Sequence, residues 1–111
     1  MLDISTTLHP SAAILHLQGR IDSASSRQLE QIAATQIDNG HLKLILDFEQ
    51  VDYISSAGLR SVLLITHKLI DLSGSLTVCN LNPSVLTVFE ITGFSKIISH
   101  YSSLEDTLLH L

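Results

Sequence analysis

Apolar and polar positions along the chain follow two periods, one typical of strands and one typical of helices. Near the N-terminus, two β-favouring runs are separated by His9, Pro10 and Ser11, which predicts two strands paired as a hairpin. Further along, a nearly continuous apolar run at 42–46 predicts a central strand covered on its faces. We therefore expect strands at 2–8, 12–18, 42–46 and 75–80, with an edge strand at 96–99.

Helices are predicted between these strands by apolar residues at helical spacing. The first begins where Ser25 and Gln28 stand at capping-box spacing and ends at Asn39 and Gly40, since glycine readily adopts the left-handed conformation after a C-cap. The second begins near Ser56 and ends at 73–74. Its expected apolar stripe consists of Leu59, Val62, Leu63, Thr66, Leu69 and Ile70.

Two shorter helices are expected towards the C-terminus. Asn82 before Pro83 places a capping residue ahead of a first-turn proline and starts the third helix. Ser102 and Glu105 stand at capping-box spacing and start the last helix, which should pack its leucines on the body of the protein. These leucines are Leu104, Leu108 and Leu111.

The order of elements predicts an α/β fold. Right-handed crossovers between alternating strands and helices produce a mostly parallel sheet, here mixed because of the first hairpin. We expect four to five strands packed with about four helices in a single domain over residues 1–111. The apolar positions of the first strands can be either core or interface, so the oligomeric state stays open.

Composition narrows the possible partners and surroundings. The formal net charge is −5, and the six Lys and Arg residues are scattered, so nucleic acid is not an expected partner. The lone Cys79 cannot form an internal disulfide, which favours a reducing, cytoplasmic location. No apolar run approaches the roughly 20 residues that span a bilayer, so no direct membrane insertion is expected. Docking on a membrane complex is compatible with this composition.

Catalytic and metal-binding patterns are weak. The stretch around Ser55 and Ser56 has only one of the two glycines of a nucleophile elbow, and His67 lies about three helical turns from Ser56 at ~1.5 Å per residue. The six histidines show no metal-ligand spacing. The acidic residues after the central strand are interpreted as loop solvation. We expect no enzyme activity, cofactor or metal site. These acidic residues are Asp47, Glu49 and Asp52.

The junction between the central strand and the second helix is the remaining candidate. Ser55 or Ser56 can cap the helix by accepting a hydrogen bond from a backbone N–H, a common role worth about 1 kcal/mol. Alternatively, a phosphate on Ser56 would place roughly −1.5 to −2 charges at the positive end of a helix, which tolerates them. Such a phosphate would change what the surface binds without unfolding the protein.

Two segments of the sequence resemble the STAS family, which comprises domains of bacterial anti-sigma factor antagonists and cytoplasmic tails of sulfate transporters. Residues 46–59 are similar to its central signature and residues 17–22 to its second recurrent segment. The resemblance implies that Ser56 falls on the phosphorylated serine and Ser55 on a position that is usually an acid. Gly19, Asp22, Asp47, Gly58 and Leu59 match the family pattern, and Ala57 is an accepted variant.

The resemblance implies a partner-switching regulator. Unphosphorylated, it would bind an anti-sigma factor that is also a serine kinase, and phosphorylation at Ser56, with Ser55 as second choice, would end that binding. Arg60 lies four residues beyond Ser56 and could pair with the phosphate or with an acid of the partner. The alternative is a scaffold or accessory subunit of an ABC-type transporter complex. The expected contact residues are Asp22, Tyr53, Ile54, Ser55, Ser56, Ala57, Gly58 and Arg60.

Overall fold

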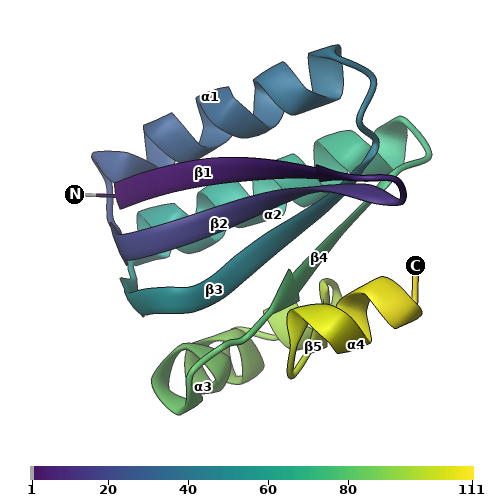
Figure 1. Cartoon of the computed structure of the whole chain (residues 1–111). Coiled ribbons are helices and arrows are strands. Elements are labelled where there is room, and N and C mark those ends of the chain that lie inside the picture. The colour runs from purple at the N-terminus through teal and green to yellow at the C-terminus, as the bar shows by residue number, and fades with distance from the viewer. Residues whose placement is uncertain (1) are drawn as a thin grey trace.

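A computed structural model describes residues 2–111, in which five strands form one mixed sheet in the order β1-β2-β3-β4-β5 (Figure 1). β1 is antiparallel to β2, and the other neighbouring strands are parallel. The predicted α/β class, with a mostly parallel sheet and four α-helices, is confirmed. The elements are β1 (Leu2–His9), β2 (Ala12–Ile21), α1 (Ser25–Asp38), β3 (Lys43–Ile54), α2 (Ser56–Asp71), β4 (Ser75–Cys79), α3 (Pro83–Ile91), the 3₁₀ helix η1 (Phe94–Lys96), β5 (Ser99–Tyr101) and α4 (Leu104–Leu109).

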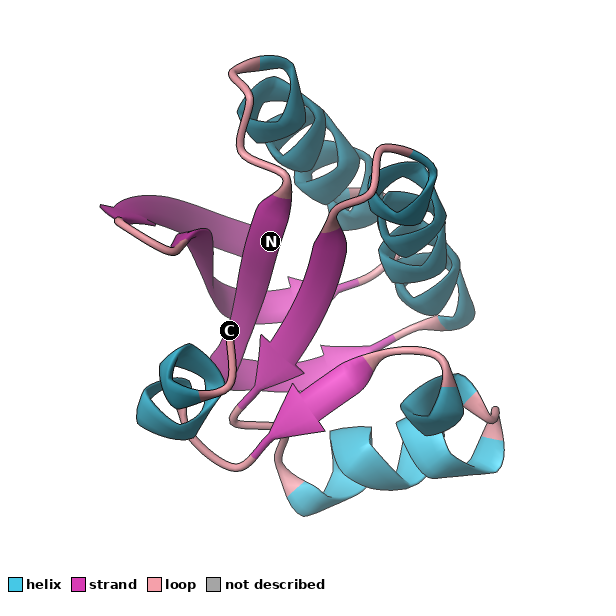
Figure 2. Ribbon diagram, turned by 90° about the vertical axis from the view of Figure 1, so that its right-hand side faces the viewer, coloured by secondary structure: helices cyan, strands magenta, loops and turns pink. Residues whose placement is uncertain are grey.

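Helices lie on both sides of the sheet (Figure 2). α1 and α2 run side by side over one face, where Leu15, Leu46 and Val78 are register neighbours on three strands and are fully buried. A smaller cluster on the opposite face joins Ile14 and Ile45 to α4. β2, β3 and β4 therefore have buried apolar side chains on both faces, which explains the continuous apolar pattern of β3. None of the helices within residues 2–111 is long and apolar enough to cross a membrane.

The central strand is longer than expected. β3 has 12 residues and continues through the segment that the sequence suggested was a loop. Two register shifts against β2, at His16/Gln18 and at Gly19/Arg20, place extra residues on β3. Bulges of this kind interrupt the two-residue alternation on which strand prediction depends. Gly19 has φ +118° at the second shift, a conformation that favours glycine.

The expected capping box of α1 does not form. Ala24 occupies the N-cap position, and the hydroxyl of Ser25 instead donates to the carbonyl of Arg20 at 2.8 Å. The N–H groups of Ala24 and Ser25 donate to Oδ1 of Asp22, at 3.1 and 3.0 Å. Asp22 therefore satisfies the first N–H groups from outside the helix, because its side chain reaches the same donors as a conventional cap.

Two predicted boundaries near the C-terminus are shifted. The edge strand begins at Ser99, because Phe94–Lys96 forms a 3₁₀ turn. The cap of α4 is Ser103, whose hydroxyl accepts from the N–H of Asp106 at 3.1 Å, whereas the hydroxyl of Ser102 donates to the Asp106 carboxylate. Leu104 and Leu108 pack on the sheet as expected, but Leu111 is 38% exposed.

The apolar stripe of α2 is correct at four of its six predicted positions. Leu59, Val62, Thr66 and Leu69 are buried as predicted. Leu63 is only partly buried and Ile70 is 56% exposed, whereas Ile65, which was not assigned to the stripe, is buried. Leu63 and Ile70 lie at the flank of the buried stripe, whose centre runs through Val62, Ile65 and Leu69.

Replacing Phe48 with alanine should destabilise the protein by about 3–5 kcal/mol. Phe48 is fully buried, and its ring meets that of Phe89 edge to face with centroids 6.0 Å apart, so truncation leaves a cavity and removes the aromatic contact. Urea unfolding followed by circular dichroism measures the change. Ile91→Ala, at an 80% exposed position of α3, is the control and should change stability by less than about 0.5 kcal/mol. Equal effects of the two substitutions would contradict this packing.

Candidate functional site

The end of β2 and the start of α2 meet at one point. Ile21 pairs with Ile54 at the end of the β2–β3 ladder, and the N–H of Ser55 donates to the carbonyl of Ile21 at 2.8 Å. Ser55 has extended backbone geometry, and its hydroxyl accepts a hydrogen bond from the N–H of Gly58 at 3.1 Å. Ser55 is therefore the N-cap of α2.

Ser56 has a different environment from Ser55. It is the first residue of α2, and its side chain is exposed. The N-terminus of a helix carries a partial positive charge that stabilises anions. A negative group on the Ser56 hydroxyl would therefore lie in a favourable field and in reach of solvent.

Gly58 allows α2 to approach β2 closely. A Cβ at this position would lie 2.7 Å from Cγ2 of Ile21 and 2.8 Å from Cγ1 of Ile54. It would also lie 3.0 Å from the carbonyl oxygen of Ile21, the atom that binds Ser55. Both isoleucines are buried and have little room to move. The glycine is required by this contact.

Asp22 lies next to this junction, directly after Ile21. Its carboxylate is held by Ala24 and Ser25 at the start of α1. Hydrogen bonds from the backbone N–H and then the hydroxyl of Ser25 hold the pKa of Asp22 below its ordinary value. The charge of Asp22 is thus fixed at the start of α1, on a side chain that is partly exposed.

Tyr53 and Ile54 differ in exposure because strand side chains alternate. Tyr53 is 41% exposed, whereas Ile54 is only 6% exposed and packs beneath the first turn of α2. The Arg20 guanidinium carbon lies 4.2 Å from the centre of the Tyr53 ring. This cation–π contact adds a positive charge to the surface that the sequence did not suggest, and the β2–β3 register between Arg20 and Tyr53 places it there.

A groove between α1 and α2 starts at Ser56. Its first part, about 530 Å³, is lined by Arg27 from α1 and by Ser56 and Arg60 from α2, among other side chains. The hydroxyl of Ser61 donates to the Glu30 carboxylate at 2.5 Å and links the two helices. Arg27 and Arg60 are both exposed, so two guanidinium groups border the groove that contains Ser56. Sequence reasoning identified Arg60 but missed Arg27, which lies on another helix.

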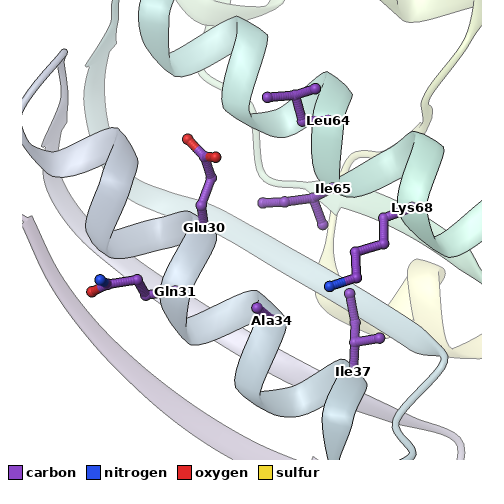
Figure 3. Close-up of a pocket in the computed structure, with 7 residues that line it drawn as sticks. All are labelled: Glu30, Gln31, Ala34, Ile37, Leu64, Ile65 and Lys68. Carbon is purple, nitrogen blue, oxygen red and sulfur yellow. The ribbon is translucent and has the colours of Figure 1, made fainter.

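The groove continues between the helices as a more apolar depression of about 270 Å³ (Figure 3). The two parts share Glu30 and Leu64. Leu64 is 50% exposed, so the surface beyond Ser56 offers apolar contact area. The second part is lined by Glu30, Gln31, Ala34, Ile37, Leu64, Ile65 and Lys68.

Asp47 is buried within β3, which corrects its interpretation as a solvated loop residue. Burial by itself would raise the pKa of Asp47, but hydrogen bonds outweigh it and hold the pKa below the ordinary value. They come from the Asn80 side chain at 3.0 Å, the N–H of Glu49 at 3.1 Å and the His16 ring at 3.0 Å. Within residues 2–111, no three His, Cys, Asp or Glu side chains form a metal-binding group.

Cys79 lies beside Asp47 and behaves as an apolar core residue. It is fully buried, and burial raises the pKa of its thiol to about 12. The thiol is therefore protonated and unreactive at neutral pH.

The profile of the STAS domain matches residues 3–107. The chain belongs to the STAS domain family. It is 47% identical over 89 residues, covering 80% of this chain and 77% of the relative, to BtrV of Bordetella bronchiseptica, whose name provisionally assigns it to the anti-sigma factor antagonists.

Solved structures of two other proteins agree with the fold. An anti-sigma factor antagonist from Mycobacterium paratuberculosis superimposes with a TM-score of 0.91 at 22% identity, over 99% of this chain and 93% of that one. The Bacillus protein SpoIIAA, solved in its phosphorylated form, superimposes with a TM-score of 0.75 at 20% identity, over 97% and 98% of the two chains. At these identities the likeness establishes the fold.

Adding a methyl group at Gly58 should destabilise this STAS chain by about 1–3 kcal/mol. The new Cβ in Gly58→Ala would push α2 away from Ile21 and weaken the hydrogen bond to Ser55. Chemical denaturation measures the loss. Ser56→Ala, two residues away at an exposed position, is the matched control and should leave stability nearly unchanged. A Gly58→Ala variant as stable as the parent would show that the contact is looser than described.

Acid stability of the STAS fold should depend on Asp47. Because its pKa is lower in the folded chain than the ordinary 3.8, its stabilising effect is complete above that value and is lost as the pH falls through the folded pKa. Asp47→Asn should therefore lower stability at pH 7 and flatten the fall in stability below about pH 4. Urea unfolding across this pH range tests both effects. Asp71→Asn, at the exposed end of α2, is the control, and identical pH profiles for parent and Asp47→Asn would refute the assignment.

Proposed function

We propose that this chain is an anti-sigma factor antagonist that works by partner switching. Unphosphorylated, it binds an anti-sigma factor that is also a serine kinase, and phosphorylation at Ser56 releases it. The observation that carries this proposal is the exposed Ser56 at the first position of α2, on a helix already capped by Ser55. The relationship to BtrV supports the class of function, and the solved phosphorylated form of SpoIIAA supports the type of switch. A kinase that uses ATP would require this function to be cytoplasmic.

The proposed contact surface surrounds Ser56. Side chains that can touch a partner are those of Asp22, Tyr53, Ser56, Ala57 and Arg60, all at least partly exposed. Ile54 and Gly58, expected from the sequence to be contacts, are buried and position the first turn of α2 instead. Ser55 is partly exposed but acts mainly as the cap.

Phosphorylation should act on the partner and leave the fold unchanged. The phosphate adds roughly −1.5 to −2 charges at the N-terminus of a 16-residue helix, where the macrodipole favours them. Arg60, one turn further along α2, and Arg27 across the groove are cations able to approach it. A bound partner would instead have to bury a dianion against a surface that fits a hydroxyl, which costs several kcal/mol.

The structure gives Ser55 a role that an acid would also fill. Aspartate and serine are both good N-caps, so Ser55 retains the start of α2 without adding a charge beside Ser56. Ser56 is preferred over Ser55 as the phosphate acceptor because the Ser55 hydroxyl is bound to the N–H of Gly58. Phosphorylation of Ser55 would have to remodel this cap.

Incubation with the cognate kinase and ATP should add one phosphate to Ser56, located by mass spectrometry. Ser56→Ala should abolish the modification and keep partner binding, whereas Ser56→Asp should weaken binding at least roughly tenfold by calorimetry, equivalent to ~1.4 kcal/mol. Ser55→Ala is the matched control. It should still be phosphorylated but lose about 1 kcal/mol of stability with the cap. Absence of phosphate at Ser56 together with unchanged binding of Ser56→Asp would refute the proposal.

A second candidate function is suggested by Ser55, which stands where the family pattern usually has an acid. In this case the chain is a scaffold in an ABC-type transporter complex, and the same surface binds without phosphorylation. Neighbouring genes for permease and ATPase subunits would favour this function. A neighbouring kinase gene and sigma factor gene would favour the first.

A further inference from the structure

The outer edge of β1 is unpaired in the sheet formed by residues 2–111. β1 is the first strand in the sheet order and pairs with β2 over all eight of its residues without a register shift. Soluble proteins commonly protect such an edge with a lysine, a proline or a bulge. Within Leu2–His9 the sequence contains no lysine, arginine or proline, and Ile4, Thr6 and Thr7 are β-branched. The edge is long, regular and competent to pair with another strand.

The hairpin fixes which backbone groups face outward. Its two-residue loop is closed by the pair His9 and Ala12, and the pair that closes such a loop exchanges backbone hydrogen bonds. In an antiparallel ladder, bonded pairs alternate along the strand. The odd-numbered residues of β1 therefore bond to β2. The N–H and C=O groups that point away from the sheet belong to Leu2, Ile4, Thr6 and Leu8.

The side chains of these even-numbered residues all lie on the face of the sheet that α1 and α2 cover. Leu2 is buried and Ile4 packs partly against the main core. Leu8, on the same face, is 61% exposed. The protein's own core thus leaves an apolar side chain of its edge strand uncovered.

We propose that β1 pairs with β1 of a second copy of this chain, antiparallel, with the two-fold axis at Thr6. This register sets the outward backbone groups of even-numbered residues opposite one another, with Thr6 facing Thr6 of the second copy. It also places the exposed Leu8 against Ile4 of the second copy. A shift by one residue would set outward groups against groups already bonded to β2.

Charge complementarity selects this register. Pairing about Thr6 puts Asp3 of each copy opposite His9 of the other. Nδ1 of His9 accepts a hydrogen bond from the N–H of Ser11 at 3.0 Å, so the proton of the neutral ring is on Nε2. That N–H is available to donate to a carboxylate. The alternative with the two-fold axis at Ser5 shifts the register by two residues. It would set Asp3 opposite Thr7 and leave His9 outside the ladder.

Sedimentation equilibrium over a concentration series tests the dimer. The parent should approach twice its 12.1 kDa mass as concentration rises. Thr6→Pro removes an outward N–H without breaking a bond to β2 and should weaken dimerisation at least roughly tenfold with an unchanged circular dichroism spectrum. A proline at Leu72 would disturb α2 and cannot serve as the control. The control is instead Leu72→Lys, a polar substitution at another exposed leucine, which should leave the dimer intact. A parent that stays monomeric, or a Thr6→Pro variant that dimerises equally well, would overturn the proposal.

The register is tested separately by charge reversal and cross-linking. His9→Asp should weaken the dimer by setting two acids opposite each other, and the double variant Asp3→His with His9→Asp should restore it. Under mild oxidation, Thr6→Cys should form a disulfide across the axis, whereas Ser5→Cys should not, because cysteines with Cα atoms over about 7 Å apart cannot be bridged. Efficient cross-linking of Ser5→Cys alone would refute the register. This dimer does not depend on Ser56, so Ser56→Asp should dimerise like the parent.

Discussion

The contact between the end of β2 and the first turn of α2 is the constraint on which the proposed site depends. Gly58 permits this contact because any larger residue would collide with Ile21. The hydrogen bond from Ser55 to the carbonyl of Ile21 joins helix and strand at the same place. Ser56 is therefore presented by the rigid end of a helix packed on the sheet, and a site on rigid elements keeps its geometry better than one on a mobile loop.

This rigidity explains how a small modification could act as a switch. A phosphate at the start of α2 meets a favourable helix end and two bordering arginines, Arg27 and Arg60. Phosphorylation is therefore not expected to change the conformation of the unbound protein. The phosphate would instead change the free energy of partner binding, because its charge would lose its solvent against the partner. In the proposed switch, partner release would therefore need no conformational change in this chain.

The sequence predicted the elements well where one periodicity dominated, as in α2 and the centre of β3. It failed where a tertiary contact replaced a local one. Bulges opposite Gly19 extended β3, and Asp22 took over the capping expected of Ser25. The candidate site around Ser56 was proposed from the STAS resemblance, but its groove was not foreseen, because Arg27 reaches it from another helix. Spacing within one segment cannot reveal neighbours that only the packing of α1 on α2 brings together.

A nuclear magnetic resonance titration of the ¹⁵N-labelled chain with its unphosphorylated partner tests the central claim most directly, because it shows where the partner binds. The account predicts that the largest amide shifts cluster at Asp22, Tyr53 and Ser56 and along the groove between α1 and α2. It also predicts that the phosphorylated chain shows no such shifts at the same concentrations. Shifts centred on α4 or on the outer edge of β1, with the start of α2 unaffected, would contradict it.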